Sequence, residues 1–272
     1  MTSNIFSILN TAKLGLLSQQ LAIEVTGQNI SNVQTEGYSR QEINFEATNP
    51  RSFSLGQLGT GVRVAGIERS HDEFLFSQIL GEGDALGRFE VRKDVFDQLE
   101  ILLSENGGQS LNQSLRKFFS GVQDVSANPT GLPERSNLVS EAKNLASVFN
   151  NLGESLFQIQ QNLDATIEVE ETRINSLTEE IASLNKAIHA NEPTAFSAND
   201  LRDKRDLKVK ELSELIDLNF VDEQDGQISL TLSDGTPLVL QSTVFTLDTS
   251  INGNNKSFKD IVIQDPAGNS TN

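Results

Sequence analysis

The strongest pattern in the chain is a heptad repeat of apolar residues between Pro133 and about Ala190. Such a repeat predicts one continuous α-helix that packs against other helices, because its apolar side chains lie on one face. At 1.5 Å per residue this helix would be about 85 Å long, so we expect an elongated molecule. The repeat, which Glu170 interrupts, consists of Leu145, Phe149, Leu152, Leu156, Ile159, Leu163, Ile167, Ile174, Leu177, Ile181, Leu184 and Ile188.

Another long helix is predicted at the N-terminus, ending near Asn32. Its core positions alternate between spacings of four and three residues, as in helices that form coiled coils. A second apolar row widens the face beyond what one neighbouring helix could cover, so two or more neighbours are expected. The first row is Ile5, Leu9, Ala12, Leu16, Gln19, Ile23, Thr26 and Ile30, and the second is Leu14, Leu17, Leu21 and Val25.

Three further helices are predicted to begin near Asp72, Leu111 and Asn199, the last one capped by side chains of residues 198–200. Alternating apolar residues in 41–47 and 61–67 predict a β-hairpin with a long loop between its strands. From residue 219 onward, alternation interrupted by Asp-Gly and Asn-Gly pairs predicts several strands joined by tight turns.

The fold class that we expect is mainly α: an elongated long-helix bundle or coiled-coil-like body with a small β-hairpin, followed by the start of a β-rich outer domain. The predicted domains are an N-terminal assembly helix with the motif that follows it (1–40), a helical bundle with the hairpin at about 41–67 (41–218), and the beginning of a β-rich domain (219–272). Because only about one more strand is expected after residue 251, we expect a truncated chain.

The composition excludes several classes of function. A formal net charge of −17 argues against nucleic acid or membrane as a partner, because both favour basic surfaces. The absence of Cys excludes disulfides and thiol catalysis, and we find neither a cleavable signal peptide nor a membrane-spanning apolar run. Neither His71 nor His189 has a second His at metal-site spacing. We therefore expect no catalytic, metal or cofactor site, and no enzyme.

The segment after the first helix contains the most informative motif. Asn29-Ile30-Ser31-Asn32 is followed by Thr35 and by Gly37-Tyr38-Ser39-Arg40-Gln41. With the first helix, this motif resembles the N-terminal signature of bacterial flagellar axial proteins, and its Ser-Arg-Gln resembles their hook-associated branch. Further matching residues are Ser7 to Leu9, Ala12, Leu17, Gln20, Leu21, Thr26, Asp72 to Leu75, Leu115 to Phe119, Asn128, Pro129, Ile181 to Asn185 and Asn199 to Asp206.

The resemblance covers roughly residues 3 to 217 and implies a structural subunit at the junction between the flagellar hook and filament. It implies terminal helices in an inner tube layer, a helical second layer and an outer β-rich domain. Family members close the inner layers with a second amphipathic region at the C-terminus, which this sequence lacks. The implied location is the extracellular flagellum, reached through type III export. The implied partners are a ring of copies of the chain itself, the flagellar hook protein, the next junction protein (hook-associated protein 3) and an export chaperone.

The first helix and the motif are together the predicted assembly interface. Its apolar residues would be buried against neighbouring subunits, and its Asn side chains would fix the register between them. The residues assigned to it are Ile5, Leu9, Leu14, Leu16, Leu17, Leu21, Ile23, Val25, Asn29, Ile30, Asn32, Tyr38 and Arg40.

Two other interpretations remain open at this point. A sibling axial protein of the hook or the rod would share the first helix and the Asn-Ile-Ser-Asn motif. A secreted protein with an enzymatic β domain would require a cluster of catalytic residues in 219–272, where we recognise none.

Overall fold

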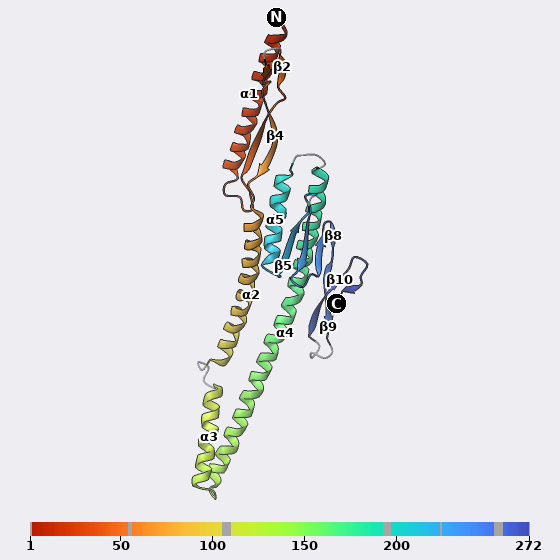
Figure 1. The fold of residues 1–272 in the computed structure, drawn as a ribbon. Coiled ribbons are helices and arrows are strands. Elements are labelled where there is room, and N and C mark those ends of the chain that lie inside the picture. Colours follow the sequence, from red (N-terminus) through yellow and green to blue (C-terminus); the bar gives the residue numbers. More distant parts are fainter. Residues whose placement is uncertain are drawn as a thin grey trace. The chain divides into compact units, whose positions relative to one another are not determined.

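The helices of the computed structural model begin and end close to the predicted positions (Figure 1). The structure describes residues 2–53, 56–104, 110–192, 197–223, 225–252 and 258–271. The helices in these ranges are α1 (Thr2–Ser31), α2 (Glu73–Leu103), α3 (Leu111–Ala127), α4 (Leu132–Asn191) and α5 (Asn199–Ser213). The heptad repeat thus forms one uninterrupted helix of 60 residues, as predicted.

The predicted hairpin is formed by β1 (Gln41–Ala47) and β4 (Val62–Arg69), which pair in antiparallel fashion with a register shift after Asn44. The segment between them, predicted as loop, contains a second antiparallel pair, β2 (Arg51–Phe53) with β3 (Gly56–Leu58). These strands are too short for their side chains to show a recognisable alternation, so the sequence pattern did not predict them.

The β-rich region after residue 218 is also as predicted. An antiparallel sheet of order β5-β6-β7-β8 and a sheet of order β11-β10-β9 follow α5. Two predicted turns contain Gly226 and Gly235 with φ of 82° and 90°, while Gly253 of the third lies outside the described residues. The strands are β5 (Leu218–Asp222), β6 (Ile228–Leu232), β7 (Pro237–Leu240), β8 (Thr243–Val244), β9 (Thr246–Ile251), β10 (Lys259–Gln264) and β11 (Ser270–Thr271).

The chain divides into two compact units. Unit 1 consists of Met1–Ala85, Arg173–Asp248 and Val262–Asn272, and unit 2 of Leu86–Thr172 and Thr249–Ile261. Because α2 and α4 each contribute to both units, this division does not follow the limits predicted from the sequence, 1–40, 41–218 and 219–272.

Unit 1 contains the buried apolar core among the described residues. One face of the second half of α4 packs with α5, with Leu80 of α2 and with the strands that follow α5. Phe76 at the start of α2 adds an edge-to-face contact with Phe220, at 5.6 Å between ring centroids. The core members are Leu80, Ile174, Leu177, Ile181, Ala182, Val209, Leu212, Ile228, Leu230, Leu238, Val239, Leu247 and Ile263.

In unit 2, α3 lies close to the first part of α4, where a Cβ on Gly121 would come within 3.5 Å of Leu138. Phe157 contacts Phe258, and the backbone N–H of Lys259 donates to Asp164. The first half of the heptad repeat is only partly covered here: Phe149 is 50% exposed, and most of the other repeat residues are half-buried. A heptad repeat indicates a face that is suited to burial, but it does not say which segment or molecule covers that face.

Candidate functional site

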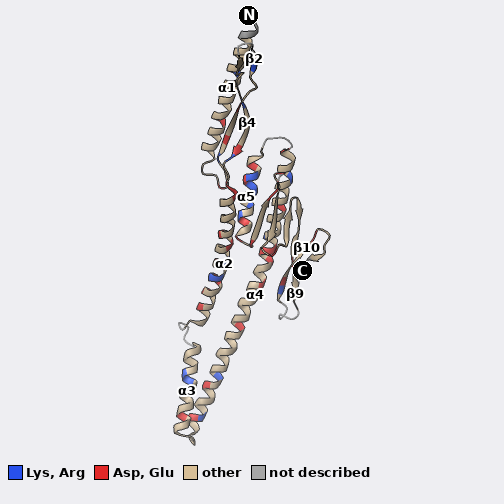
Figure 2. Cartoon of the chain, in the orientation of Figure 1, with Lys and Arg blue, Asp and Glu red and all other residues tan. Residues whose placement is uncertain are grey.

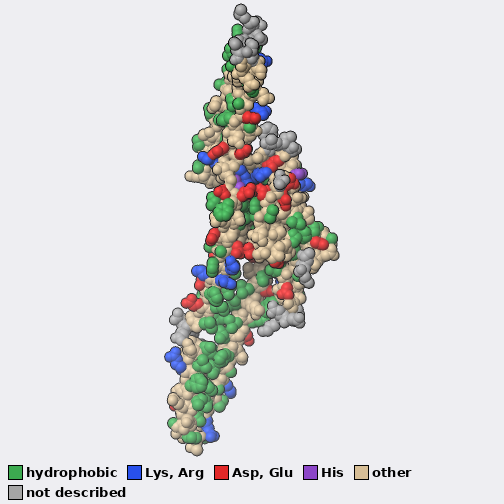
Figure 3. Space-filling view, viewed as in Figure 1, with side chains coloured by type: hydrophobic (Ala, Val, Ile, Leu, Met, Phe, Trp, Pro, Cys, Tyr) green, Lys and Arg blue, Asp and Glu red, His purple; other side chains and the backbone are tan. Residues whose placement is uncertain are grey.

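The outward face of α1 carries many exposed apolar side chains, and Figure 3 shows apolar atoms scattered among polar ones over this part of the chain. Leu16 is 72% exposed and Ile23 is 73% exposed, although both belong to the predicted helix core. Phe6 and Ile8, which were not assigned to the interface, extend this surface. The predicted interface residues on the exposed surface are Ile5, Leu9, Leu16, Leu17, Ile23 and Ile30.

The inward face of α1 packs against β1 and β4 of its own hairpin (Figure 1). Val25 is buried, and Leu14 and Leu21 are half-buried, so these three predicted interface residues are partly or wholly covered within the chain. The Thr11 hydroxyl donates to the carbonyl of Thr60 at 3.0 Å, which attaches the far end of the hairpin to the helix. One of the expected neighbours of α1 is therefore a β-hairpin.

A groove of about 640 Å³ runs between the C-terminal part of α1 and β1. Its two charged residues, Arg40 and Glu42, form an ion pair with each other. The groove is therefore neutral overall, and most of its lining is apolar or small. Its lining residues are Ala22, Val25, Thr26, Asn29, Ile30, Asn32, Val33, Tyr38, Arg40, Gln41, Glu42, Ile43 and Phe45.

Asn29 connects the end of α1 to the start of the hairpin. Its side-chain nitrogen donates to the carbonyl of Gln41 at 2.9 Å, and its oxygen accepts from the Gln41 N–H at 2.9 Å. The same oxygen accepts from the Tyr38 hydroxyl at 2.9 Å. Both ends of the Asn29 amide are thus paired inside the chain, where they fix the conformation of the motif.

The remaining predicted interface residues, Asn32 and Arg40, lie at the edge of the motif. The side-chain nitrogen of Asn32 donates back to the Gln28 carbonyl at 3.1 Å, and its oxygen accepts from the Thr35 hydroxyl at 3.2 Å. Asn32 therefore terminates the helix with local bonds. The Arg40 side chain is exposed apart from its pair with Glu42.

The motif is held from the other side by α5, a short helix rich in charged residues (Figure 2). Asp203 accepts from the Ser39 N–H at 2.8 Å with one oxygen and from Arg69 at 3.1 Å with the other. Asp200 accepts from the Gln41 amide at 3.0 Å. Gly37, at φ 77°, leaves room for Leu207, which a Cβ would approach to 3.2 Å.

The predicted side-chain cap of α5 is absent. The N-cap is Ala198, which makes no side-chain cap hydrogen bond, and Asn199 instead donates to the carbonyl of Ile67 at 2.9 Å. The prediction was wrong because the helix begins at Asn199, so the N-cap position is occupied by Ala198, whose side chain cannot accept a hydrogen bond.

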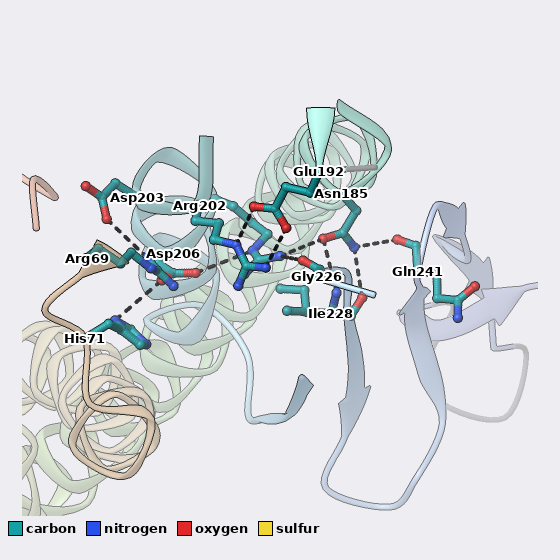
Figure 4. Close-up of polar contacts among 11 residues, drawn as sticks. Arg69, His71, Asn185, Glu192, Arg202, Asp203, Asp206, Gly226, Ile228 and Gln241 are labelled. Carbon is teal, nitrogen blue, oxygen red and sulfur yellow. Dashed lines mark hydrogen bonds and ion pairs between the residues drawn. The ribbon is translucent and has the colours of Figure 1, made fainter. Parts of the chain in front are cut away.

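The polar contacts between α5 and the hairpin continue through Arg69 and Asp206 (Figure 4). Arg69 donates to Asp206 at 2.6 Å, and His71 lies 3.7 Å from the same carboxylate. Burial and the neighbouring Arg69 charge lower the pKa of His71, and they outweigh the opposite effect of Asp206. The side chains of Arg69, Asp203 and Asp206 are nearly buried, so their charges are poorly screened by solvent.

Arg205 is fully buried and pairs with Asp206 at 3.4 Å. Its guanidinium donates to the Gly226 carbonyl at 2.7 Å and to Asn185 Oδ1 at 3.3 Å. Asn185 in turn donates to the carbonyls of Ile228 and Gln241. Burial lowers the pKa of Arg205. This residue connects α5 to α4 and to the sheet that begins with β5.

A second buried pair lies at the end of α4. Arg202 donates to both carboxylate oxygens of Glu192, at 2.9 and 2.7 Å, in the bidentate geometry that gives strong ion pairs. Gly226 has a φ of 82°, which favours glycine, and a Cβ there would lie 2.5 Å from the Glu192 carboxylate, so the ion pair would have to shift. Nearby, burial raises the pKa of Asp222 despite the two arginines, because desolvation outweighs their attraction.

This polar network was not among the predicted sites, although the spacing of three aspartates in the sequence could have indicated it. Asp200, Asp203 and Asp206 follow each other at intervals of three, which places them on one side of a helix. Their partners Arg69 and Ser39 lie more than 130 residues earlier. Only the fold could bring these groups together.

The described residues contain no group of three or more His, Asp or Glu side chains arranged to hold a metal ion. Among the same residues, no helix has the length and apolarity that crossing a membrane requires.

Comparison with known proteins identifies similar chains. The family model described as "Flagellar hook-associated protein FlgK helical domain" matches residues 96–272. Flagellar hook-associated protein 1 of Bacillus subtilis is 33% identical over 94% of this chain and 52% of its own length. The protein of the same name from Salmonella typhimurium is 29% identical over 87% of this chain and 43% of its own length. The chain thus spans about half the length of the curated relatives that it matches.

A solved structure is also similar. It is titled "The structure of the flagellar hook junction protein FlgK from Burkholderia pseudomallei", and it superposes with a TM-score of 0.61 at 27% identity. The superposition covers 70% of this chain and 33% of that chain. Helices, hairpin and later strands therefore share one fold with a characterised relative.

Proposed function

Because the chain belongs to the family of the flagellar hook-associated protein FlgK, we propose that it is a structural, non-enzymatic subunit of the bacterial flagellum at the hook–filament junction. The names of its relatives, which are hook-associated and hook junction proteins, support this place. We do not retain the alternatives of a hook or rod protein or of a secreted enzyme, because no observation favours them.

The outward face of α1 carries the proposal. It exposes eight large apolar side chains, namely Ile5, Phe6, Ile8, Leu9, Leu16, Leu17, Ile23 and Ile30, and exposed apolar side chains gathered on one element mark sites of interaction. Burying one such side chain contributes about 1.5–3 kcal/mol, so several together can offset the entropic cost of bringing subunits into a fixed arrangement. We propose that the exposed residues of α1 contact neighbouring subunits. Val25 and Asn29, which were also predicted in the interface, support this surface from within the chain.

The distribution of charge favours copies of the same chain as neighbours. The chain has a net charge of −17, and two copies would repel each other over most of their surface. Within α1 the charged residues are Lys13 and Glu24, whose charges cancel (Figure 2). The first helix is thus a segment where copies of an acidic chain can approach closely.

The remaining partners follow from family membership. We propose that the ring of subunits is placed between the flagellar hook protein and the next junction protein, hook-associated protein 3. We also propose that the chain leaves the cell through the flagellar type III channel with the help of an export chaperone.

A charge placed on the outward face of α1 tests the proposal. We expect Leu16→Asp to leave the helix content unchanged, because Leu16 is 72% exposed, and to remove the chain from isolated flagella. The matched control is Asn10→Asp, which adds a negative charge at an exposed polar position of the same helix. The measurements are circular dichroism of the purified chain and its amount in isolated flagella. Equal incorporation of Leu16→Asp and the wild type would contradict the proposed role of α1.

A further inference from the structure

The hairpin module, by which we mean α1 with the strands β1 to β4, lies outside the apolar core of unit 1. In the described ranges, the buried apolar cluster draws its members from α2, α4, α5 and the strands after α5. None of them comes from residues 2–53 or 56–69. The module therefore depends on other interactions for its position.

The contacts that hold the module are mainly polar and converge on one side of α5. Asp203 uses both carboxylate oxygens, one for the Ser39 N–H before β1 and one for Arg69 at the end of β4. Asp206 holds Arg69 a second time, at 2.6 Å. Asp200 holds the side chain of Gln41. We call Asp200, Asp203 and Asp206 the α5 latch.

We propose that the α5 latch positions the assembly surface, and that the hairpin module opens from unit 1 as one piece when the latch is broken. Asp203 is the central positioning residue, because its single carboxylate binds the residue two positions before β1 and the last residue of β4, which lie together at one end of the hairpin. This inference rests on the proposed function for its consequence in assembly, but the opening itself can be measured on the isolated chain.

Two features make such an opening independent of the core. Asp206 is paired with Arg205 at 3.4 Å on its far side, and Arg205 is anchored by Gly226 and Asn185, so the α5 side of the latch remains fixed when the module leaves. The module also has its own internal bonds, through Asn29 to Gln41 and through the ladder between β1 and β4. Regions held by few buried apolar contacts are the ones that open locally at low free energy.

The chain contains a natural probe of the module. Tyr38 is the only tyrosine and there is no tryptophan, so intrinsic fluorescence reports on this residue alone. Its hydroxyl is bonded to Asn29, inside the motif that the latch holds. Circular dichroism, in contrast, reports on all helices, most of which lie outside the module. Urea unfolding followed by both signals separates opening of the module from global unfolding.

The first variant is Asp203→Asn, which removes the charge and leaves one acceptor where two are used. We expect its Tyr38 transition to move to lower urea by about 1 M, while the circular dichroism transition stays in place. Exchange of the Ser39 N–H, which donates to Asp203, should rise about tenfold to a hundredfold, while the amides of the ladder between β1 and β4, which leave with the module, and those of β6 and β7 stay unchanged. Asp217→Asn is the matched control, since it makes the same change at an exposed aspartate beyond the end of α5.

A second variant, Arg69→Gln, removes the Arg69–Asp203 ion pair from the module side. It keeps the test valid if Asp203→Asn folds poorly. Its effect should be like that of Asp203→Asn, and the double variant should cost less than the sum of the two single variants, because they share one ion pair. Conversely, Asp203→Glu keeps the charge, so its Tyr38 transition should lie at a higher urea concentration than that of Asp203→Asn. Coincident shifts of both signals in either variant, or unchanged exchange of the Ser39 N–H, would overturn the proposal.

The assembly measurement separates this inference from the proposed function. We expect at least tenfold less Asp203→Asn chain than wild-type chain in isolated flagella, because its assembly surface is no longer held. If the wild-type chain itself is absent from flagella, the proposed function fails. The Tyr38 transition of the isolated chain still tests whether the α5 latch holds the module. If Asp203→Asn opens the module but assembles normally, the positioning role is refuted.

Discussion

Replacement of Arg205 by leucine tests whether the buried polar network stabilises unit 1. Arg205 is 0% exposed and donates to three acceptors, the Gly226 carbonyl at 2.7 Å, Asn185 Oδ1 at 3.3 Å and the carboxylate of its ion-pair partner Asp206 at 3.4 Å. Leaving a buried acceptor unpaired costs about 1–3 kcal/mol, and breaking a buried ion pair from one side costs about 3–5 kcal/mol. The leucine avoids the desolvation cost of the guanidinium, which recovers part of this loss. We therefore expect a net destabilisation of about 2–4 kcal/mol.

The assay is urea unfolding at pH 7, followed by circular dichroism and analysed by linear extrapolation. The matched control is Arg63→Leu, whose guanidinium pairs with Glu46 at 2.7 Å but whose side chain is 62% exposed. Exposed pairs contribute about 0–1 kcal/mol, so this control should change little. Arg205→Lys, which keeps the charge but loses the planar fork, should fall between them. Should Arg205→Leu cost no more than Arg63→Leu, the reasoning about the buried network is refuted.

Two further predictions concern pH and backbone conformation. Since the pKa of His71 is lowered in the folded chain by burial and Arg69, the unfolded chain binds its proton more readily. Stability should therefore fall as pH drops below about 6.5, until the lowered pKa is passed, and His71→Gln should flatten this part of a melting-temperature profile against pH. Gly226→Ala should destabilise by about 1–3 kcal/mol more than Gly235→Ala in urea unfolding. Both glycines have positive φ, but only at Gly226 would the Cβ meet Glu192 at 2.5 Å, so equal effects would disprove the steric argument.

Much of the fold could be predicted because it is encoded in local spacing. The heptad repeat predicted α4 with its ends displaced by about one residue, and alternation predicted β1, β4 and the later sheets. The strands β2 and β3 were missed because three residues are too few to show a period of two. The cap of α5 was predicted wrongly because the helix begins at Asn199, which leaves Ala198, a residue without a polar side chain, at the N-cap position.

The candidate site was likewise predictable only where its features depend on local sequence. Periodicity identified the apolar positions of α1, but it could not tell Leu16, which faces outward, from Val25, which is buried against the hairpin. The motif was recognised from residues that are adjacent in sequence. Whether Asn29 is paired within the chain depends on Gln41 and Tyr38, whose positions are set by the turn after the helix.

The sequence by itself determined the helices and strands, the neutral apolar character of α1 and the family, because these properties depend on residue types at short, regular spacings. The tertiary structure decided which face of α1 stays exposed and how Asp203 joins Ser39 to Arg69 across more than 130 residues. Such contacts depend on the path of the whole chain. A charged residue has the same appearance in a sequence whether it will face solvent, as Arg63 does, or be buried among partners, as Arg205 is.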